Sequence, residues 1–529
     1  MNTNGSALDK IHPDNHKWYV AGTVMIGLFM TVLVSNIVNV ALPHMVTAFS
    51  TNTDRIRWVV ESYAMSYAIF ALTTSWLRER IGIKYVFITG MTIFTISSIL
   101  CGMSWTIESL IFFRILQGIG GGIMMPTGFT LIAESFPPQE RGAAFGVFGL
   151  VIVVAPSIGP TVGGYIVDYV NWRYIFYVNV PVGILTFFLA MTYLSETRKL
   201  KPTKFDFWGF VGLATFLGCL LVALTNGQSD GWKSDTILSY FFVSGLGLVF
   251  FLIVSPRAKN PILNLEVFKS FHFSIIAILN LTRSVALYGR MFLLPLFLQN
   301  IVGYPARTAG LMLMPGALMS GVTMPFIGRL VDKYGPRFFI FTGLILMGIS
   351  TFTYHSIDTM TPYATILYPT LLFGVGSGLL NTPITATAMN VVKREHIGQA
   401  STILSVIMQV GGAFGVAILG TIMSNRTALH YEIFKENITQ YSFLTQGGLK
   451  GIETLGQRIG ELPYWIQLQK LPLLDMSTKL EAAICGFQDA FIYTAMACFL
   501  ALVPALGLFN LKLPHHQKEK SGDDFIAIE

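Results

Sequence analysis

The chain has 529 residues, of which 53% are hydrophobic and only 12% are charged. A soluble domain carries about a quarter charged residues, so this composition excludes an ordinary soluble enzyme. The net charge of +7 comes from bases spread over many short segments, which argues against a nucleic-acid-binding protein.

Apolar runs of roughly 20 residues follow one another along the whole chain, with short polar gaps between them. Each run is long enough to cross a hydrocarbon core of about 30 Å, where the backbone finds no hydrogen-bond partners in the lipid. The runs lack the period-two alternation of barrel strands, so they predict helices. We expect fourteen spans, near 18–43, 56–77, 85–103, 107–133, 143–167, 173–195, 206–226, 237–255, 272–299, 307–328, 337–357, 362–390, 398–424 and 485–511.

The placement of lysine and arginine predicts the orientation of these spans. Bases gather in the N-terminal segment and in every second loop, whereas the short loops on the other side hold few. Basic loops stay in the cytoplasm. With an even number of spans, both termini are expected on the cytoplasmic side. The first run is too long for the hydrophobic region of a signal peptide, so it is read as a span.

Two loops on that side carry the same pattern of residues. Acid, base, glycine and base recur at a constant offset of 253 residues, as from Gly82 to Gly335. The glycines permit sharp turns, and the acid can cap a neighbouring helix N-terminus or pair with a base. Two copies in register predict an internal duplication, although each alone reads as a tight basic turn. The residues that would hold one face of the protein closed are Glu79, Arg80, Gly82, Asp332, Lys333, Gly335 and Arg337.

Further motifs resemble the major facilitator superfamily, in its fourteen-helix drug/proton antiporter branch (EmrB/QacA-like). The resemblance covers nearly the whole chain and joins the two loops to several helix motifs. These motifs are Ile37–Pro43, Trp58–Tyr63, the arginine motif Arg114–Gly120, the exporter motif Gly159–Gly164, Asn171–Phe176 and Asn179–Gly183.

The resemblance implies an all-α polytopic fold with two six-helix bundles and two linking helices, fourteen spans in total. The implied boundaries, in chain order, are a cytoplasmic N-terminus at 1–17, an N-terminal bundle at 18–200, linking helices at 201–270, a C-terminal bundle at 271–511 with an outer loop at 425–484, and a cytoplasmic tail at 512–529.

The resemblance also implies a function, namely proton-coupled export of amphipathic compounds across a bacterial inner membrane by alternating access. Export is implied by the motif that contains Gly159, Pro160, Gly163 and Gly164. Protons would be the coupling ion, with no other cofactor. The chain carries no phosphate loop, metal cluster or Ser/His/Asp arrangement, which argues against an enzyme and an ATP-driven pump. Expected partners are the lipid bilayer, a small amphipathic substrate and a periplasmic adaptor; the alternative for the 425–484 loop is to lie on the membrane surface.

Glu61 is the expected proton carrier, because the chain departs from the family in its first helix. The family usually has an acid there, at the position of Val34, whereas the second span carries Glu61 instead. An ionised residue inside a span costs roughly 2.5–3.5 kcal/mol, so it normally has a function or a partner. We expect Arg114 to tune the charge of Glu61. The alternative places Glu61 at the headgroup level, beside Arg55 or Arg57.

Two arginines in the ninth span bear on the substrate. Arg283 and Arg290 lie seven residues apart, on roughly one helix face, with no mid-span acid in the second half. They favour a dedicated exporter or flippase of an endogenous anionic lipid, siderophore or metabolite as the alternative function; otherwise they bond neighbours such as Asn280. A non-transporting receptor is a third class, which the intact motifs argue against. The candidate cavity residues are Asn36, Asn39, Tyr63, Tyr67, Gln117, Arg283, Arg290, Gln299 and Asn381.

Overall fold

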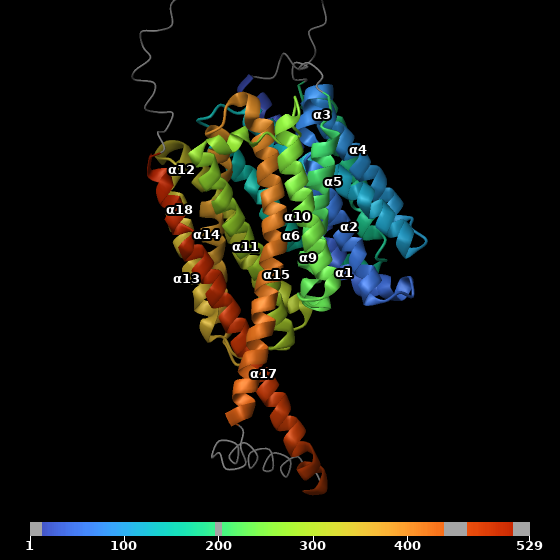
Figure 1. The fold of residues 1–529 in the computed structure, drawn as a ribbon, viewed down its shortest axis with the longest axis vertical. Helices are drawn as coiled ribbons and strands as arrows, with labels where there is room; N and C mark the ends of the chain where they lie inside the picture. Colours follow the sequence, from blue (N-terminus) through green and yellow to red (C-terminus); the bar gives the residue numbers. More distant parts are fainter. Residues whose placement is uncertain (1–12, 196–203, 438–462, 511–529) are drawn as a thin grey trace, which may run out of the picture.

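The computed structural model describes residues 13–195, 204–437 and 463–510, and this part of the chain folds into helices without strands. Thirteen of these helices are long and apolar enough to cross a membrane, by length and composition. The predicted all-α membrane fold is therefore confirmed. The helices run side by side as a tall bundle (Figure 1) and include α1 (Pro13–Ala48), α4 (Ile83–Gly102), α5 (Ile107–Ser135), α6 (Arg141–Tyr169), α7 (Tyr174–Tyr177), α8 (Asn179–Tyr193), α11 (Phe271–Asn300), α12 (Ala306–Tyr334), α13 (Arg337–Phe352) and α14 (Tyr363–Asn390).

One of the fourteen predicted spans, the second, differs from the expectation. It is divided into α2 (Thr53–Ala71) and α3 (Thr74–Ile81), and it is not among the thirteen apolar helices of the described residues. Arg55, Arg57 and Glu61 lower the hydropathy of α2. The helix nevertheless packs along α5, where a Cβ atom on Gly118 would lie 2.5 Å from the carbonyl oxygen of Tyr63.

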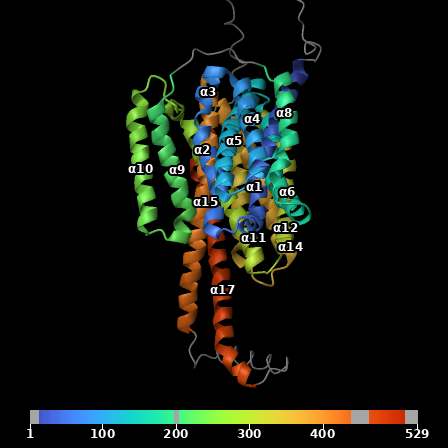
Figure 2. The same cartoon turned by 90° about the vertical axis from the view of Figure 1, so that its right-hand side faces the viewer.

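Helices α9 (Phe207–Asp230) and α10 (Asp235–Val254) stand on one side of the bundle, as Figure 2 shows. Helix α9 contacts both α2 of the first half and α15 (Ile397–Asn437) of the second. Helix α10 packs on α9 at Gly212 and Gly247, where a Cβ atom on Gly212 would lie 3.1 Å from the Gly247 oxygen. Most other side chains of α10 point outward and are apolar, as expected of a lipid-facing helix.

The segment 425–484 is not a loop over the residues that the structure describes, which corrects the prediction. Helix α15 continues to Asn437, and α17 (Pro463–Leu500) begins at a proline. Proline suits the first turn of a helix because its missing N–H has no partner there. The middle of the predicted loop, residues 438–462, lies outside the described residues.

Together α15 and α17 project beyond the bundle as a helical hairpin, at the lower end in Figure 1. Polar contacts join them: the hydroxyl of Tyr431 donates to Asp475 at 2.6 Å, and His430 Nε2 lies 2.9 Å from Asp489 Oδ2. We call this end of the bundle the hairpin end. The opposite end, where residues 75–84 and 328–337 lie, is the loop-motif end.

Candidate transport site between the two halves

The two repeated loops make the same turn. Gly82 ends α3 with φ of 87° and Gly335 ends α12 with φ of 83°, a backbone region that side chains other than glycine rarely adopt. The bases beside them are exposed: Arg80 lies over the Trp76 ring at 5.2 Å, and Lys333 lies over the Tyr334 ring at 5.2 Å. Glu79 and Arg337, the remaining predicted members, are half-buried.

Asp332 joins the two halves at the loop-motif end. Its Oδ1 accepts a hydrogen bond from the backbone N–H of Gly142 at 2.8 Å, and its Oδ2 accepts one from Ala143 at 2.8 Å. These N–H groups belong to the first turn of α6, where a carboxylate is favoured by the helix dipole and by unpaired donors. The approach is close because a Cβ atom on Gly142 would lie 2.5 Å from the Gly328 oxygen.

Arg141, which the sequence analysis did not single out, forms a second cross-link at this end. It is buried, and its Nη1 donates to the carbonyl oxygen of Met389 and to the side chain of Asn390, both at 2.9 Å. In the sequence it reads as one more base in a basic loop, so no signal distinguished it. Two hydroxyl contacts add to the closure of this end: Thr130 with Ser401 at 2.7 Å and Ser75 with Thr402 at 3.3 Å.

Arg114 is fully buried on α5, at a depth two turns from the hairpin end. Its Nε donates to the carbonyl oxygen of Val59 at 2.9 Å, its Nη1 donates to Gln117 at 2.7 Å, and its guanidinium lies 4.2 Å from the centre of the Tyr63 ring. Among the described residues, its Nη2 has no hydrogen-bond partner. Gln117 in turn donates to Ser98 at 2.7 Å, which fixes the network to α4.

Glu61 does not lie beside Arg114, in contrast to the expectation. Its carboxyl group interacts with Asn226, Arg57 and Asp230, so it faces the outer part of α9. Glu61 stands two residues from Val59 and from Tyr63, which both contact Arg114; this spacing turns Glu61 to the opposite face of α2. The side chain is 7% exposed, and its Oε1 has no hydrogen-bond partner in the part of the chain that the structure describes.

A line of tyrosines leads from Arg114 to Arg283 across the boundary between the halves. Tyr63 and Tyr67 of α2 have ring centres 6.1 Å apart, and Tyr67 interacts with Tyr288 of α11. Tyr288 interacts with Arg283, whose Nη2 donates to Asn280 at 2.9 Å. The bond to Asn280 matches the alternative reading of this arginine. Tyr288 was missed because one tyrosine in an apolar span carries no distinguishing signal.

Arg290 lies inside the second half and not on this line. Its Nη2 donates to the Tyr354 hydroxyl at 3.1 Å and to Thr370 at 3.0 Å, and its guanidinium lies 4.1 Å from the centre of the Phe373 ring. In the described part of the chain, no ion pair joins a carboxylate to Arg114, Arg283 or Arg290.

The remaining predicted cavity residues lie on three helices, α1, α11 and α14. Asn36 is half-buried and donates to the Val32 oxygen of its own helix at 2.8 Å, whereas Asn39 is exposed. Gln299 is exposed near the end of α11 and donates to Pro295 at 3.2 Å. Asn381 is buried in α14, with Met324 of α12 as a distant partner. Among the described residues, no hydrogen bond joins any two of these four side chains.

The glycines of the exporter motif bring α6 onto α1. A Cβ atom on Gly159 would lie 3.3 Å from the Cβ of Asn36, and one on Gly163 would lie 2.7 Å from Ile37. At Gly164 such an atom would have no neighbour within 4 Å among the described residues. Pro160 lies within the same helix. Small residues permit this approach of two helix backbones in a membrane.

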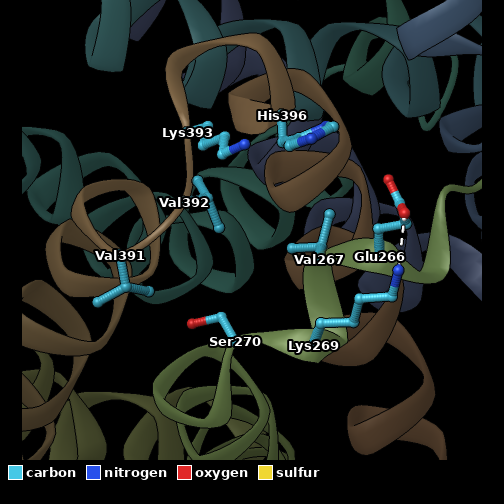
Figure 3. Close-up of a pocket in the computed structure, with 8 residues that line it drawn as sticks. All are labelled: Glu266, Val267, Lys269, Ser270, Val391, Val392, Lys393 and His396. Atoms are coloured by element: carbon cyan, nitrogen blue, oxygen red, sulfur yellow. Dashed lines mark hydrogen bonds and ion pairs between the residues drawn. The ribbon is translucent and has the colours of Figure 1, made fainter.

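A surface pocket of about 380 Å³ opens at the loop-motif end (Figure 3) and contains none of the predicted site residues. Lys269 and then Asn264 hold the pKa of Glu266 below its ordinary value by hydrogen bonding to its carboxylate. Within the described residues, no three His, Cys, Asp or Glu side chains are grouped to hold a metal ion. The lining consists of Glu266, Val267, Lys269, Ser270, Val391, Val392, Lys393 and His396.

Comparison with known proteins identifies the family and several relatives of this chain. The model of the Major Facilitator Superfamily matches residues 24–416. The multidrug transporter protein MdtP of Bacillus subtilis is 32% identical over 523 residues, covering 94% of this chain and 95% of its own. The fatty acid resistance protein FarB of Neisseria gonorrhoeae is 30% identical over 507 residues (93% and 96%). The multidrug export protein EmrB of Escherichia coli is 28% identical over 448 residues (84% and 87%).

Proposed function

The chain belongs to the Major Facilitator Superfamily, and we propose that it exports amphipathic compounds in exchange for protons by alternating access. Its kinship with multidrug transporters supports the direction and the class of cargo. Both halves of such a transporter would move about a site between them. Protons serve as the coupling ion in this proposal, and no bound cofactor takes part.

The burial of the Glu61 carboxylate is the observation that supports proton coupling. Glu61 is the only carboxylate among the buried side chains of the described residues, and one of its oxygens lacks a partner. A buried carboxylate without full hydrogen bonding is costly when charged, so it binds a proton readily and releases it when hydrated. In the proposal, this group takes up a proton on one side of the membrane and releases it on the other.

The contacts at the loop-motif end support a gate. Asp332 and Arg141 each bind backbone groups of the opposite half. These bonds can break and form again without rearranging either half, as alternating access requires. In this proposal the loop-motif end lies in the cytoplasm of a bacterial cell, with the protein in the inner membrane and both termini cytoplasmic; the bases of the loops support this orientation. The structure then represents a state that is closed toward the cytoplasm.

An anionic substrate is the second candidate, and the buried charges favour it. Four arginines but one carboxylate are buried among the described residues: Arg114, Arg141, Arg283 and Arg290 against Glu61. A negative headgroup near Arg283, with tyrosine rings around its apolar body, would offset this positive charge. The name of FarB links a relative of similar length to fatty acids. The dedicated export of an endogenous anionic lipid, siderophore or metabolite fits the same site.

The hairpin of α15 and α17 supports a further partner. It extends from the bundle at the end opposite the basic loops, so it would stand in the periplasm. We propose that a periplasmic adaptor protein binds there in a cell with two membranes. Leu429, Ile433 and Met476 are exposed apolar side chains on the hairpin and would form part of the contact.

The test is transport into proteoliposomes under an imposed pH gradient, with a panel of anionic, zwitterionic and cationic amphipaths. The wild type should accumulate at least one substrate only when the gradient is present. Glu61→Gln should abolish that accumulation while leaving substrate binding intact. Proton-driven transport that survives unchanged in Glu61→Gln would refute the role of Glu61. Arg283→Lys against Arg283→Gln would test the anion preference, because only the lysine keeps the positive charge.

A further inference from the structure

The linking helix α9 packs along the seam between α2 and α15, so it contacts both halves of the protein. In the middle of the helix, a Cβ atom on Gly218 would lie 3.8 Å from Met65 and 3.7 Å from Ile69 of α2. On its other side, Leu220 and Leu224 form an apolar cluster with Ala417 of α15. A simple tether between two bundles would not need to be buried in this way.

The outer end of α9 is tied to both halves by polar contacts. Toward α2, the Arg57 guanidinium donates to the Ser229 hydroxyl at 3.1 Å. Toward α15, the indole N–H of Trp232, in the turn that follows α9, donates to the Thr421 hydroxyl at 2.8 Å, and Gln228 of α9 donates to the Gly420 carbonyl at 3.4 Å. The packing at Gly420 is close, because a Cβ atom there would lie 2.5 Å from the Gln228 oxygen.

The two sides of α9 differ in chemistry. The contact with α15 consists of apolar side chains, an indole, a hydroxyl and an amide, none of which titrates. The contact with α2 contains the buried carboxyl of Glu61, which faces Asn226 and Asp230 of α9 and Arg57 of its own helix. Arg114 of α5 lies on the other face of α2, over Tyr63. A proton on Glu61 would therefore change the contact with α2 and leave the contact with α15 as it is.

We propose that α9 completes the proton site of Glu61 and couples that site to the second half of the protein through α15. This rests on the proposed proton-driven export. Asn226 is the positioning residue on α9, and Trp232 is the residue that transmits its movement to α15. Loss of either contact separates proton binding from substrate movement without removing Glu61.

The experiment compares two processes in proteoliposomes: accumulation driven by a pH gradient, and exchange of labelled for unlabelled substrate without a gradient. Asn226→Leu should lower the driven process about tenfold, equivalent to losing one hydrogen bond to a charged group, and leave exchange near the wild-type rate. Trp232→Phe, which keeps the ring against Phe241, should also lower the ratio of driven transport to exchange. Thr225→Val is the matched control, because that hydroxyl donates to the Leu221 carbonyl of its own helix at 2.8 Å and to no other helix among the described residues.

The inference is overturned if both variants keep the wild-type ratio, or if they lower driven transport and exchange equally, as misfolding would. Failure of the proposed function looks different: the wild type itself would then show no accumulation that depends on the pH gradient.

Discussion

The seam formed by α6 and α12 is a direct contact between the two halves, whereas the seam between α2 and α15 is covered along its length by α9. At the first seam, Gly142 and Gly328 bring the backbones together and Asp332 caps α6. At the second, the loop-motif end has the weaker contact of Ser75 with Thr402, and the hairpin end is bridged through Arg57, Ser229 and Trp232.

If the two halves were exact repeats, the two seams would have the same contacts. The difference between the seams therefore shows which residues differ between the two copies. The turns are the same, with nearly equal φ angles at Gly82 and Gly335. Ser75 occupies the position of Gly328, however, and a side chain there keeps the backbones further apart than a glycine pair. We expect the tight seam to act as the gate and the covered seam to carry the coupling.

The largest expected effect is that of Gly328→Val. A Cβ atom at this position collides with the backbone of Gly142, so the gate cannot close and transport should be lost. Gly310→Val on the same helix is the control, because none of the described residues places an atom within 4 Å of a Cβ atom there. Transport by both purified variants, with protein amount and melting temperature recorded, checks this. A Gly328→Val protein that transports normally would contradict the tight seam.

Asp332→Asn should open the gate in a fraction of molecules. A hydrogen bond to a charged group contributes about 1.5–3 kcal/mol, so losing the charge should favour the open state by about tenfold or more. The measurement is the rate at which a membrane-impermeant thiol reagent, applied from the loop-motif side, labels a cysteine at Ser401 in a protein without its native cysteines. Lys333→Gln, a change to an exposed neighbour, should leave that rate unchanged; equal rates in Asp332→Asn and the wild type would count against the cap.

Much of this architecture can be predicted from the sequence, because span length, basic loops and glycine turns are local properties of the chain. The positions of Gly82, Gly335 and Arg114 are examples. The partner of Glu61 is distant in the sequence. Which residues Glu61 contacts depends on where α9 packs against α2, and no pattern in 206–226 predicts that packing. Arg141 was missed for a similar reason, since its partners Met389 and Asn390 lie in the other half.

Arg141→Lys should weaken the same gate by a smaller amount. Lysine keeps the positive charge, but it cannot reach Ala133, Met389 and Asn390 together as the planar guanidinium does. We expect the labelling rate at the Ser401 position to rise about threefold, near the effect of one neutral hydrogen bond. Arg80→Lys, at an exposed position over Trp76, serves as the control. A rise as large as that of Asp332→Asn would reverse the order proposed for these two residues.

Ser75→Ala should have the smallest effect of the series. The bond from Ser75 to Thr402 is long, at 3.3 Å, and both hydroxyl groups are small, so we expect less than about a twofold change in the labelling rate. A large change here, comparable to that of Asp332→Asn, would mean that the two seams contribute equally to closure.

The most direct test is a set of three spin-label distances, recorded as the reconstituted protein moves between its conformations at high and low pH. Arg80 with Lys333 reports on the gate, Lys233 with Arg55 reports on α9 against α2, and Lys233 with Ser424 reports on α9 against α15; all five side chains are exposed. We predict that the first two distances change while the third stays constant. A third distance that changes while Lys233 stays fixed relative to Arg55 would contradict the account.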